Sequence, residues 1–248
     1  IENITELLKA KRVGMSPAQI DWILTDSRSL CFAEETLFFA LKTKRNDGHK
    51  YIPELYERGV RNFVVSDLPS HMEDYANANF LQVPNPLKGL QRLAEKHREL
   101  FQVPVIGITG SNGKTVVKEW LYQLLSPEKV ITRSPRSYNS QIGVPLSVWW
   151  MNESTELGIF EAGISEMREM EALQSIIRPT IGVLTNIGGA HQENFFSLED
   201  KCMEKLALFK DVDERYIVES MNVNATAVMR IIHCFYDRIS SKADFFCG

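Results

Sequence analysis

The chain lacks several features that would place it in a specialised class of protein. Its 248 residues include only four cysteines, and no two form a C-x-x-C pair, so neither a zinc site nor a disulfide framework is indicated. No apolar run approaches the roughly 20 residues that span a bilayer. A net charge of −4 gives no basic excess for holding nucleic acid. Scattered thiols and a start unlike a signal peptide predict a cytoplasmic protein.

What is present is typical of a globular protein, and it falls into two regions of different texture. The length suits two modest domains or one large one. Residues 1 to about 84 alternate brief strands with short helices, which predicts a small mixed α/β domain. The run Pro84-Asn-Pro86 breaks this pattern, and a helix over 87–101 leads into the second region. We therefore expect one domain over residues 1–98 and another over 99–248. The strands expected in the first are 22–25, 36–41, 62–65 and 80–83, and its helix is 51–58.

The second region has a regular pattern of continuous apolar strands that alternate with helices. This pattern predicts a doubly wound, mostly parallel sheet covered on both faces. Ligands bind such sheets beyond the carboxyl ends of the strands. The expected strands are 103–109, 157–160, 180–185 and 216–218, and the expected helices are 114–125, 167–177, 198–209 and 222–239.

A glycine-containing loop separates the first of these strands from its helix. Backbone N–H groups in such a turn, with the positive end of the helix dipole, bind phosphate. Lys114 would reach the outer phosphates of ATP, and the Thr115 hydroxyl would ligate Mg²⁺. The full eight-residue motif is not met, because Ile108 occupies its first glycine position. An ordinary turn with a surface lysine is the alternative, and it accounts poorly for the whole set: Gly110, Ser111, Asn112, Gly113, Lys114 and Thr115.

Polar residues also follow the next strands. Glu161 comes at a strand end and is a candidate Mg²⁺ ligand, although a capping or solvated glutamate is the alternative. Asn186 and His191 follow the next strand, and the glycines between them favour a ligand-binding loop over a purely structural histidine. The polar loop 138–145 is either a solvated connection or a substrate contact, and the pattern leaves both open.

Four motifs of the second region occur together in a known family. T-G-S-N-G-K-T (109–115), Y-N-S-Q-I-G-V-P (138–145), E-A-G (161–163) and L-T-N-I-G-G-A-H (184–191) resemble, in this order, the ATP-dependent Mur ligases of peptidoglycan synthesis. In the first region T-D-S-R (25–28), L-F-F-A-L-K (37–42) and D-G-H (47–49) resemble the uridine-nucleotide-binding domain of members that add the third or later residues. The V-V after Thr115 and the run E-A-G-I-S-E depart from the sequence usual at these positions in the family.

The resemblance extends to about residue 218 and implies a reaction. The run D-G-H-x-Y-I, with G-V-R-N-F-V-V after it, is most similar to members that join D-alanyl-D-alanine to UDP-N-acetylmuramoyl-tripeptide, some of which carry a fused alanine racemase. ATP would phosphorylate the peptide carboxylate, and the amine of D-alanyl-D-alanine would attack the acyl phosphate. A bacterial, cytoplasmic enzyme without nucleic-acid or membrane partners is implied.

The resemblance also implies roles for single residues. Lys114, Glu161, His191 and Lys205 would serve catalysis, with Lys205 at the position of a lysine that is carbamylated in several members; a solvated helix lysine is the alternative. Thr115 and Glu161 would hold one Mg²⁺ and His191 a second metal, while Asn186 would belong to the ATP site. The expected substrate contacts are Ser27, Arg28, Lys42, Arg45, Asp47, His49 and Asn139.

Members of the family have a third domain that brings the amino substrate, and the sequence stops near the expected end of the central one. We therefore expect a fragment that binds UDP-sugar-peptide and, more weakly, ATP, but ligates little or nothing. The alternatives are the ligase that adds the third residue to UDP-N-acetylmuramoyl-dipeptide, a non-catalytic nucleotide-binding module, and a folylpolyglutamate synthetase, which lacks the T-D-S-R domain.

Overall fold

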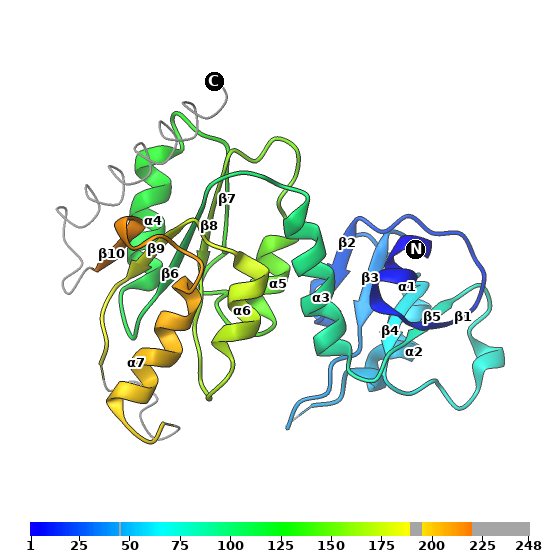
Figure 1. Ribbon diagram of the computed structural model, residues 1–248. Coiled ribbons are helices and arrows are strands. Elements are labelled where there is room, and N and C mark those ends of the chain that lie inside the picture. The colour runs from blue at the N-terminus through cyan, green and yellow to red at the C-terminus, as the bar shows by residue number, and fades with distance from the viewer. Residues whose placement is uncertain (45, 189–194, 220–248) are drawn as a thin grey trace. The chain divides into compact units, whose positions relative to one another are not determined.

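A computed structural model describes residues 1–44, 46–188 and 195–219 of the chain. It divides into two compact units, Ile1–Leu93 and Ala94–Gly248, both drawn in Figure 1. The division falls within helix α3 (Pro86–Glu99), as does the boundary expected at residues 98 and 99. The helix expected over 222–239 lies outside the described residues. No described helix is long and apolar enough to cross a membrane.

The first unit is built on a five-stranded sheet in the order β1-β5-β4-β3-β2. Strands β2 to β5 are parallel, and β1 pairs with β5 in the antiparallel direction. The four parallel strands and α2 confirm the sequence prediction, whereas α1 and β1 were missed because they are short and of mixed polarity. The elements are α1 (Glu2–Leu8), β1 (Lys11–Val13), β2 (Trp22–Leu24), β3 (Thr36–Phe39), α2 (Ile52–Glu57), β4 (Asn62–Val65) and β5 (Asn79–Gln82).

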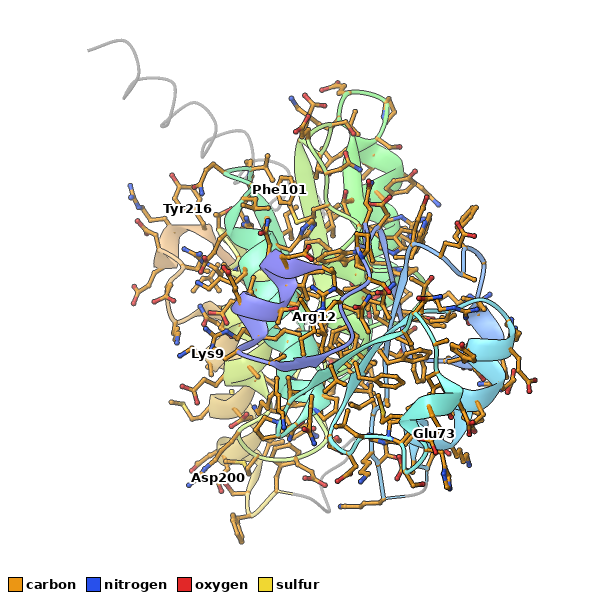
Figure 2. The ribbon with its side chains drawn as sticks, turned by 90° about the vertical axis from the view of Figure 1, so that its right-hand side faces the viewer. Lys9, Arg12, Glu73, Phe101, Asp200 and Tyr216 are labelled. Atoms are coloured by element: carbon orange, nitrogen blue, oxygen red, sulfur yellow. The ribbon has the colours of Figure 1, made fainter. Side chains whose placement is uncertain are left out.

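Aromatic rings form the core of this unit. Phe63 of β4 stacks on Phe80 of β5 with ring centroids 5.1 Å apart, and Phe38 and Tyr75 pack edge-on against this pair. Arg12 of β1, labelled in Figure 2, donates a 2.8 Å hydrogen bond to the Asn79 side chain of β5. This contact adds to the pairing of the edge strand β1 with β5. Strands β3 and β4 are buried at every position, and all but the first residue of each, Thr36 and Asn62, are apolar, as expected of parallel strands covered on both faces.

The second unit contains a five-stranded sheet in the order β10-β9-β6-β8-β7, and all its described pairings are parallel. Helices lie on both of its faces (Figure 1), as the sequence predicted. The strand order reverses at β6, the type of position where doubly wound sheets bind ligands. The elements are β6 (Val105–Thr109), α4 (Lys114–Leu125), β7 (Ile131–Arg133), α5 (Gly143–Val148), β8 (Leu157–Glu161), α6 (Met170–Ile177), β9 (Ile181–Leu184), α7 (Leu198–Leu206) and β10 (Ile217–Glu219).

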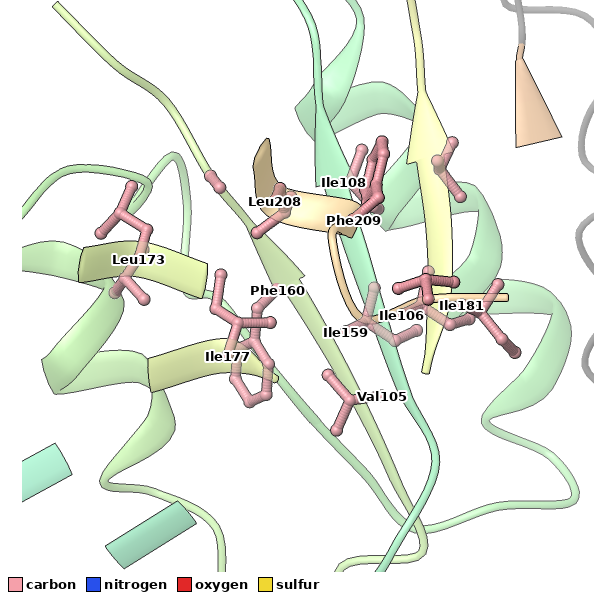
Figure 3. Close-up of a cluster of buried hydrophobic side chains, with 14 of the residues drawn as sticks. Val105, Ile106, Ile108, Ile159, Phe160, Leu173, Ile177, Ile181, Leu208 and Phe209 are labelled. Carbon is pink, nitrogen blue, oxygen red and sulfur yellow. The ribbon is translucent and has the colours of Figure 1, made fainter. Parts of the chain in front are cut away.

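Figure 3 shows buried side chains of this sheet and its helices, among them Ile106 of β6, Ile159 of β8 and Phe209. A short 3₁₀ turn, Ala207–Phe209, continues α7 and packs on the sheet. The approach is close, because a Cβ added at Gly182 of β9 would lie 2.7 Å from the Phe209 ring. Burial of this turn therefore fixes the C-terminal end of α7, including Lys205, over the sheet.

Candidate functional site

The predicted phosphate loop lies between β6 and α4 and depends on two glycines. Gly110 has φ +140° and Gly113 has φ +82°, which are backbone conformations that L side chains rarely adopt. A Cβ on Gly110 would lie 2.0 Å from the Thr185 hydroxyl. The loop can therefore turn sharply into α4 only with glycine at this position.

The end of β9 holds the loop in place. Ser111 donates its backbone N–H to the Asn186 carbonyl at 2.9 Å, and Asn112 donates its N–H to the Asn186 side chain at 2.8 Å. Asn186, expected at the ATP site, thus holds the phosphate loop through two hydrogen bonds to its backbone. The first turn of α4 leaves backbone N–H groups without intrahelical acceptors, and an anion would bind there at the positive end of the helix dipole.

Three lysines converge on this loop. Lys114 and Lys205 both donate to the Gly110 carbonyl, at 2.8 Å and 3.1 Å, and Lys201 donates to the Gly188 carbonyl at 2.5 Å. Burial lowers the pKa of Lys114. Burial, followed by the charges of Lys114 and Lys201, lowers the pKa of Lys205 to about 8. The arrangement is a positive and partly dry site, which suits phosphate.

Sequence reasoning missed Lys201. Its side chain is buried, one helical turn before Lys205 on the same face of α7. That spacing of four residues was the signal available in the sequence.

The structure brings together Thr115, at the start of α4, and Glu161, at the strand end expected beside the phosphate loop. The Thr115 hydroxyl donates to Oε2 of Glu161 at 3.1 Å and lies 3.2 Å from the Ser137 hydroxyl. Glu161 ends β8, and its side chain is fully buried. Its Oε2 accepts from Thr115, and its Oε1 lies against the Lys118 ammonium group. A hydroxyl beside a buried carboxylate oxygen fits a small hard cation.

Lys118 is a second buried lysine that the sequence analysis did not single out. Its Nζ lies 2.9 Å from Oε1 of Glu161 as an ion pair, and 3.2 Å from Oε1 of Glu119. It also donates to the Arg136 carbonyl. The signal was a lysine inside the apolar stripe of α4, between Val117 and Leu121.

Two further residues expected at the site of this unit are Asn139 and His191, and the structure describes only the first. The Asn139 carbonyl accepts the Gly163 N–H at 2.7 Å, which places it beside the end of β8. His191 lies outside the described residues, so its metal role stays a prediction. Within 1–44, 46–188 and 195–219, no group of three or more His, Cys, Asp or Glu side chains could hold a metal.

The family model for the Mur ligase middle domain matches residues 108–239. The chain belongs to the Mur ligase family. The match includes the phosphate loop, Glu161 and Lys205, the residues that the geometry gathers around one site. The family resemblance inferred from the sequence motifs is thereby confirmed.

The similarity to known Mur ligases extends beyond the part of the chain that matches the middle-domain family model. The UDP-N-acetylmuramoyl-tripeptide–D-alanyl-D-alanine ligase of Bacillus subtilis is 32% identical over 217 residues, 86% of this chain and 46% of that protein. The MurF ligase of Thermotoga maritima in complex with ADP aligns with TM-score 0.70 and 26% identity over 87% of this chain and 48% of its own. MurF of Acinetobacter baumannii shares the fold, with TM-score 0.79 at 24% identity over 94% of this chain and 51% of its own. The chain spans about half the length of these relatives.

The substrate contacts expected in the first unit of this Mur ligase chain follow parallel strands. Ser27 and Arg28 come after β2, in a 3₁₀ turn capped by Asp26. Arg28 is exposed and pairs with Asp26 at 2.6 Å, and this hydrogen bond lowers the pKa of Asp26. The Ser27 side chain is buried, and its carbonyl accepts from Arg58 at 2.8 Å.

Lys42, Asp47 and His49 of the Mur ligase chain come after β3, beside the end of β4. Nδ1 of His49 lies 2.6 Å from Oδ1 of Asp47, and Nε2 accepts the Ser66 N–H at 3.1 Å. Both ring nitrogens therefore have partners within the unit, so His49 fixes the loop to β4. Lys42 remains half exposed and donates to Asp67 at 2.6 Å. Arg45 lies outside the described residues.

Proposed function

We propose that this chain provides the nucleotide-binding and UDP-sugar-peptide-binding parts of an ATP-dependent ligase of peptidoglycan precursor synthesis. The reaction would join D-alanyl-D-alanine to UDP-N-acetylmuramoyl-tripeptide. The observation that carries the proposal is the gathering of Lys114, Thr115, Glu161 and Lys205 around one phosphate loop. The printed names of the relatives support the choice of substrates. A bacterial, cytoplasmic location, with no nucleic-acid or membrane partner, belongs to the same proposal.

The chemistry starts from a carboxylate that is too poor an acyl donor to react with an amine. The terminal carboxylate of the peptide would attack the γ-phosphorus of ATP, which forms an acyl phosphate as ADP leaves. The amine of D-alanyl-D-alanine would then attack the acyl carbon, form the amide bond and release phosphate and a proton. Two anions must meet in the first step, so neutralising their charge is the main task of the site.

Lys114 is suited to that task. Its ammonium group donates to Gly110 of its own loop, a neutral acceptor that a charged phosphate oxygen would replace. The free N–H groups of the first turn of α4 would bind the same phosphates. Thr115 and Glu161 would hold Mg²⁺, which would supply further positive charge to neutralise the phosphates.

Lys205 has a different proposed role. A pKa of about 8 leaves about a tenth of its amine neutral at pH 7, far more than for a lysine with the ordinary pKa of 10.5. A neutral amine can add CO₂ and lose a proton, which turns a buried cation into a carbamate anion. We propose this modification, which ¹³C NMR of protein kept in labelled bicarbonate would detect as a carbamate signal absent from a Lys205→Met variant.

In the first unit, Arg28 and Lys42 are the exposed cations that we propose to contact the uridine diphosphate group. Asp47 and His49 would support Lys42 by holding the loop, with Arg45 and Ser27 as further proposed contacts in this unit. In the second unit, Asn139 is the proposed contact to the muramoyl-peptide. Each cation has a carboxylate partner, Asp26 or Asp67, which the substrate phosphates would have to replace.

Calorimetry on the chain tests the assignment. We expect binding of UDP-N-acetylmuramoyl-tripeptide, and of ADP when Mg²⁺ is present. Stronger binding of UDP-N-acetylmuramoyl-dipeptide would favour the ligase that adds the third residue. Binding of folate without any UDP-sugar-peptide would contradict the proposal. Nucleotide binding without UDP-sugar-peptide binding would leave the non-catalytic module as the better account.

A further inference from the structure

Lys118 is a buried charge beside the proposed metal ligands that the proposed chemistry does not use. The Lys118 and Glu161 side chains are both fully buried, and Lys118 lies against Oε1 at 2.9 Å. Thr115, three residues earlier on α4, donates to the other oxygen, Oε2, at 3.1 Å. Two side chains of α4 thus contact different oxygens of the Glu161 carboxylate.

Neighbouring groups hold the Lys118 ammonium group in this position. Oε1 of Glu119 lies 3.2 Å from it, and Glu119 is in turn paired with Arg133 at 2.5 Å. The Arg136 carbonyl accepts a further hydrogen bond from Lys118. Because these groups belong to α4, β7 and the β7–α5 connection, the ammonium group stays on Oε1 without help from a ligand.

We propose that Lys118 is a positioning residue that makes the site selective for Mg²⁺ over Ca²⁺. The inference rests on the proposed function of Thr115 and Glu161. With Lys118 on Oε1, the carboxylate offers a single oxygen, Oε2, beside the Thr115 hydroxyl. Mg²⁺ requires compact octahedral geometry, whereas Ca²⁺ accepts more oxygens and often takes both from one carboxylate. Lys118 therefore removes the ligand that Ca²⁺ would gain.

The test is ADP binding to the chain, measured by calorimetry with Mg²⁺ or with Ca²⁺. In Lys118→Met, Oε1 is free and a positive charge is gone, so Ca²⁺ should gain more than Mg²⁺. We expect the Mg²⁺ preference, as the ratio of the two apparent affinities, to fall about 10-fold. The matched control is Lys129→Met, which removes a lysine paired with Glu156 at 3.8 Å, outside the site; its ratio should stay at the wild-type value.

An unchanged ratio in Lys118→Met would overturn the inference. If that variant does not fold, Lys118→Gln is tested in its place, because its neutral amide binds Oε1 more weakly than an ammonium group does. A reduced Mg²⁺ preference in Lys118→Gln supports the inference, and a wild-type preference overturns it. If the wild-type chain does not bind ADP in the presence of Mg²⁺, the proposed function itself is overturned, which is a different result from an unchanged ratio in the variant.

Discussion

At the scale of single residues, Gly110 shows how strictly the loop constrains its sequence. Its φ of +140° and the position of Thr185 leave no room for a side chain. Gly110→Ala should destabilise the chain by roughly 1–3 kcal/mol and weaken ADP binding, because the loop must shift. Gly188→Ala is the control, since its added Cβ would meet Ser111 at an ordinary 3.8 Å. Chemical denaturation and calorimetry would measure both, and equal effects would contradict the account.

Lys205 makes a pH-dependent contribution to stability. Its pKa is lowered from 10.5 to about 8 in the folded state, so the unfolded chain binds more protons between these values. Stability contributed through this group should therefore rise with pH from about 8 to 10.5, by at most about 1.4 kcal/mol per pH unit. Below pH 8 its burial as a cation opposes folding.

The check compares denaturation of the wild-type chain with that of Lys205→Met across this pH range. The difference in unfolding free energy should change with pH in the stated direction. Lys210→Met, at an exposed position, should show no such change relative to wild type. A pH-independent difference for Lys205→Met would contradict the assigned environment.

At the scale of elements, α7 depends on the 3₁₀ turn that follows it. Phe209 packs against Gly182, so Phe209→Ala should lower the free energy of unfolding by about 3–5 kcal/mol. It should also weaken ADP binding, because Lys201 and Lys205 lie on the helix that this turn fixes. Phe196→Ala is the control, since that ring is 96% exposed. Similar stability losses in both variants would contradict this packing argument.

In the first unit, His49 links the loop after β3 to the end of β4. His49→Ala removes both its contact with Asp47 and that with Ser66, so binding of the UDP-sugar-peptide should weaken while ADP binding stays unchanged. His71→Ala, at an exposed position, should change neither. Calorimetry with each ligand distinguishes these results. Undiminished UDP-sugar-peptide binding in His49→Ala would show that the link serves folding alone.

At the scale of the whole molecule, the sequence predicted the elements whose pattern is continuous and missed those whose pattern is short. The parallel strands β6, β8 and β9 are buried along their length, so their apolar runs were sufficient. Strand β7 has only three half-buried residues, and α1 alternates in polarity without a clear face. Such elements form because neighbouring elements cover them, which a local pattern does not contain.

The candidate site was predictable where a motif fixes position along one loop, as for Lys114 and Thr115. It was not predictable where contacts cross between elements. Lys118 lies on an apolar helix stripe, and Lys201 lies 13 residues beyond the Gly188 carbonyl that it binds. Pairing these lysines with their partners requires the order of strands in the sheet, which depends on tertiary packing.

We propose that this one chain carries two ligand sites, one for nucleotide and one for UDP-sugar-peptide. The most direct measurement is calorimetry of both ligands on wild type and Lys114→Ala. The Lys114 side chain donates to Gly110 of the phosphate loop, so the variant should lose ADP binding and retain UDP-N-acetylmuramoyl-tripeptide binding at wild-type affinity. Equal loss of both ligands in a folded variant, or undiminished ADP binding, would contradict the account.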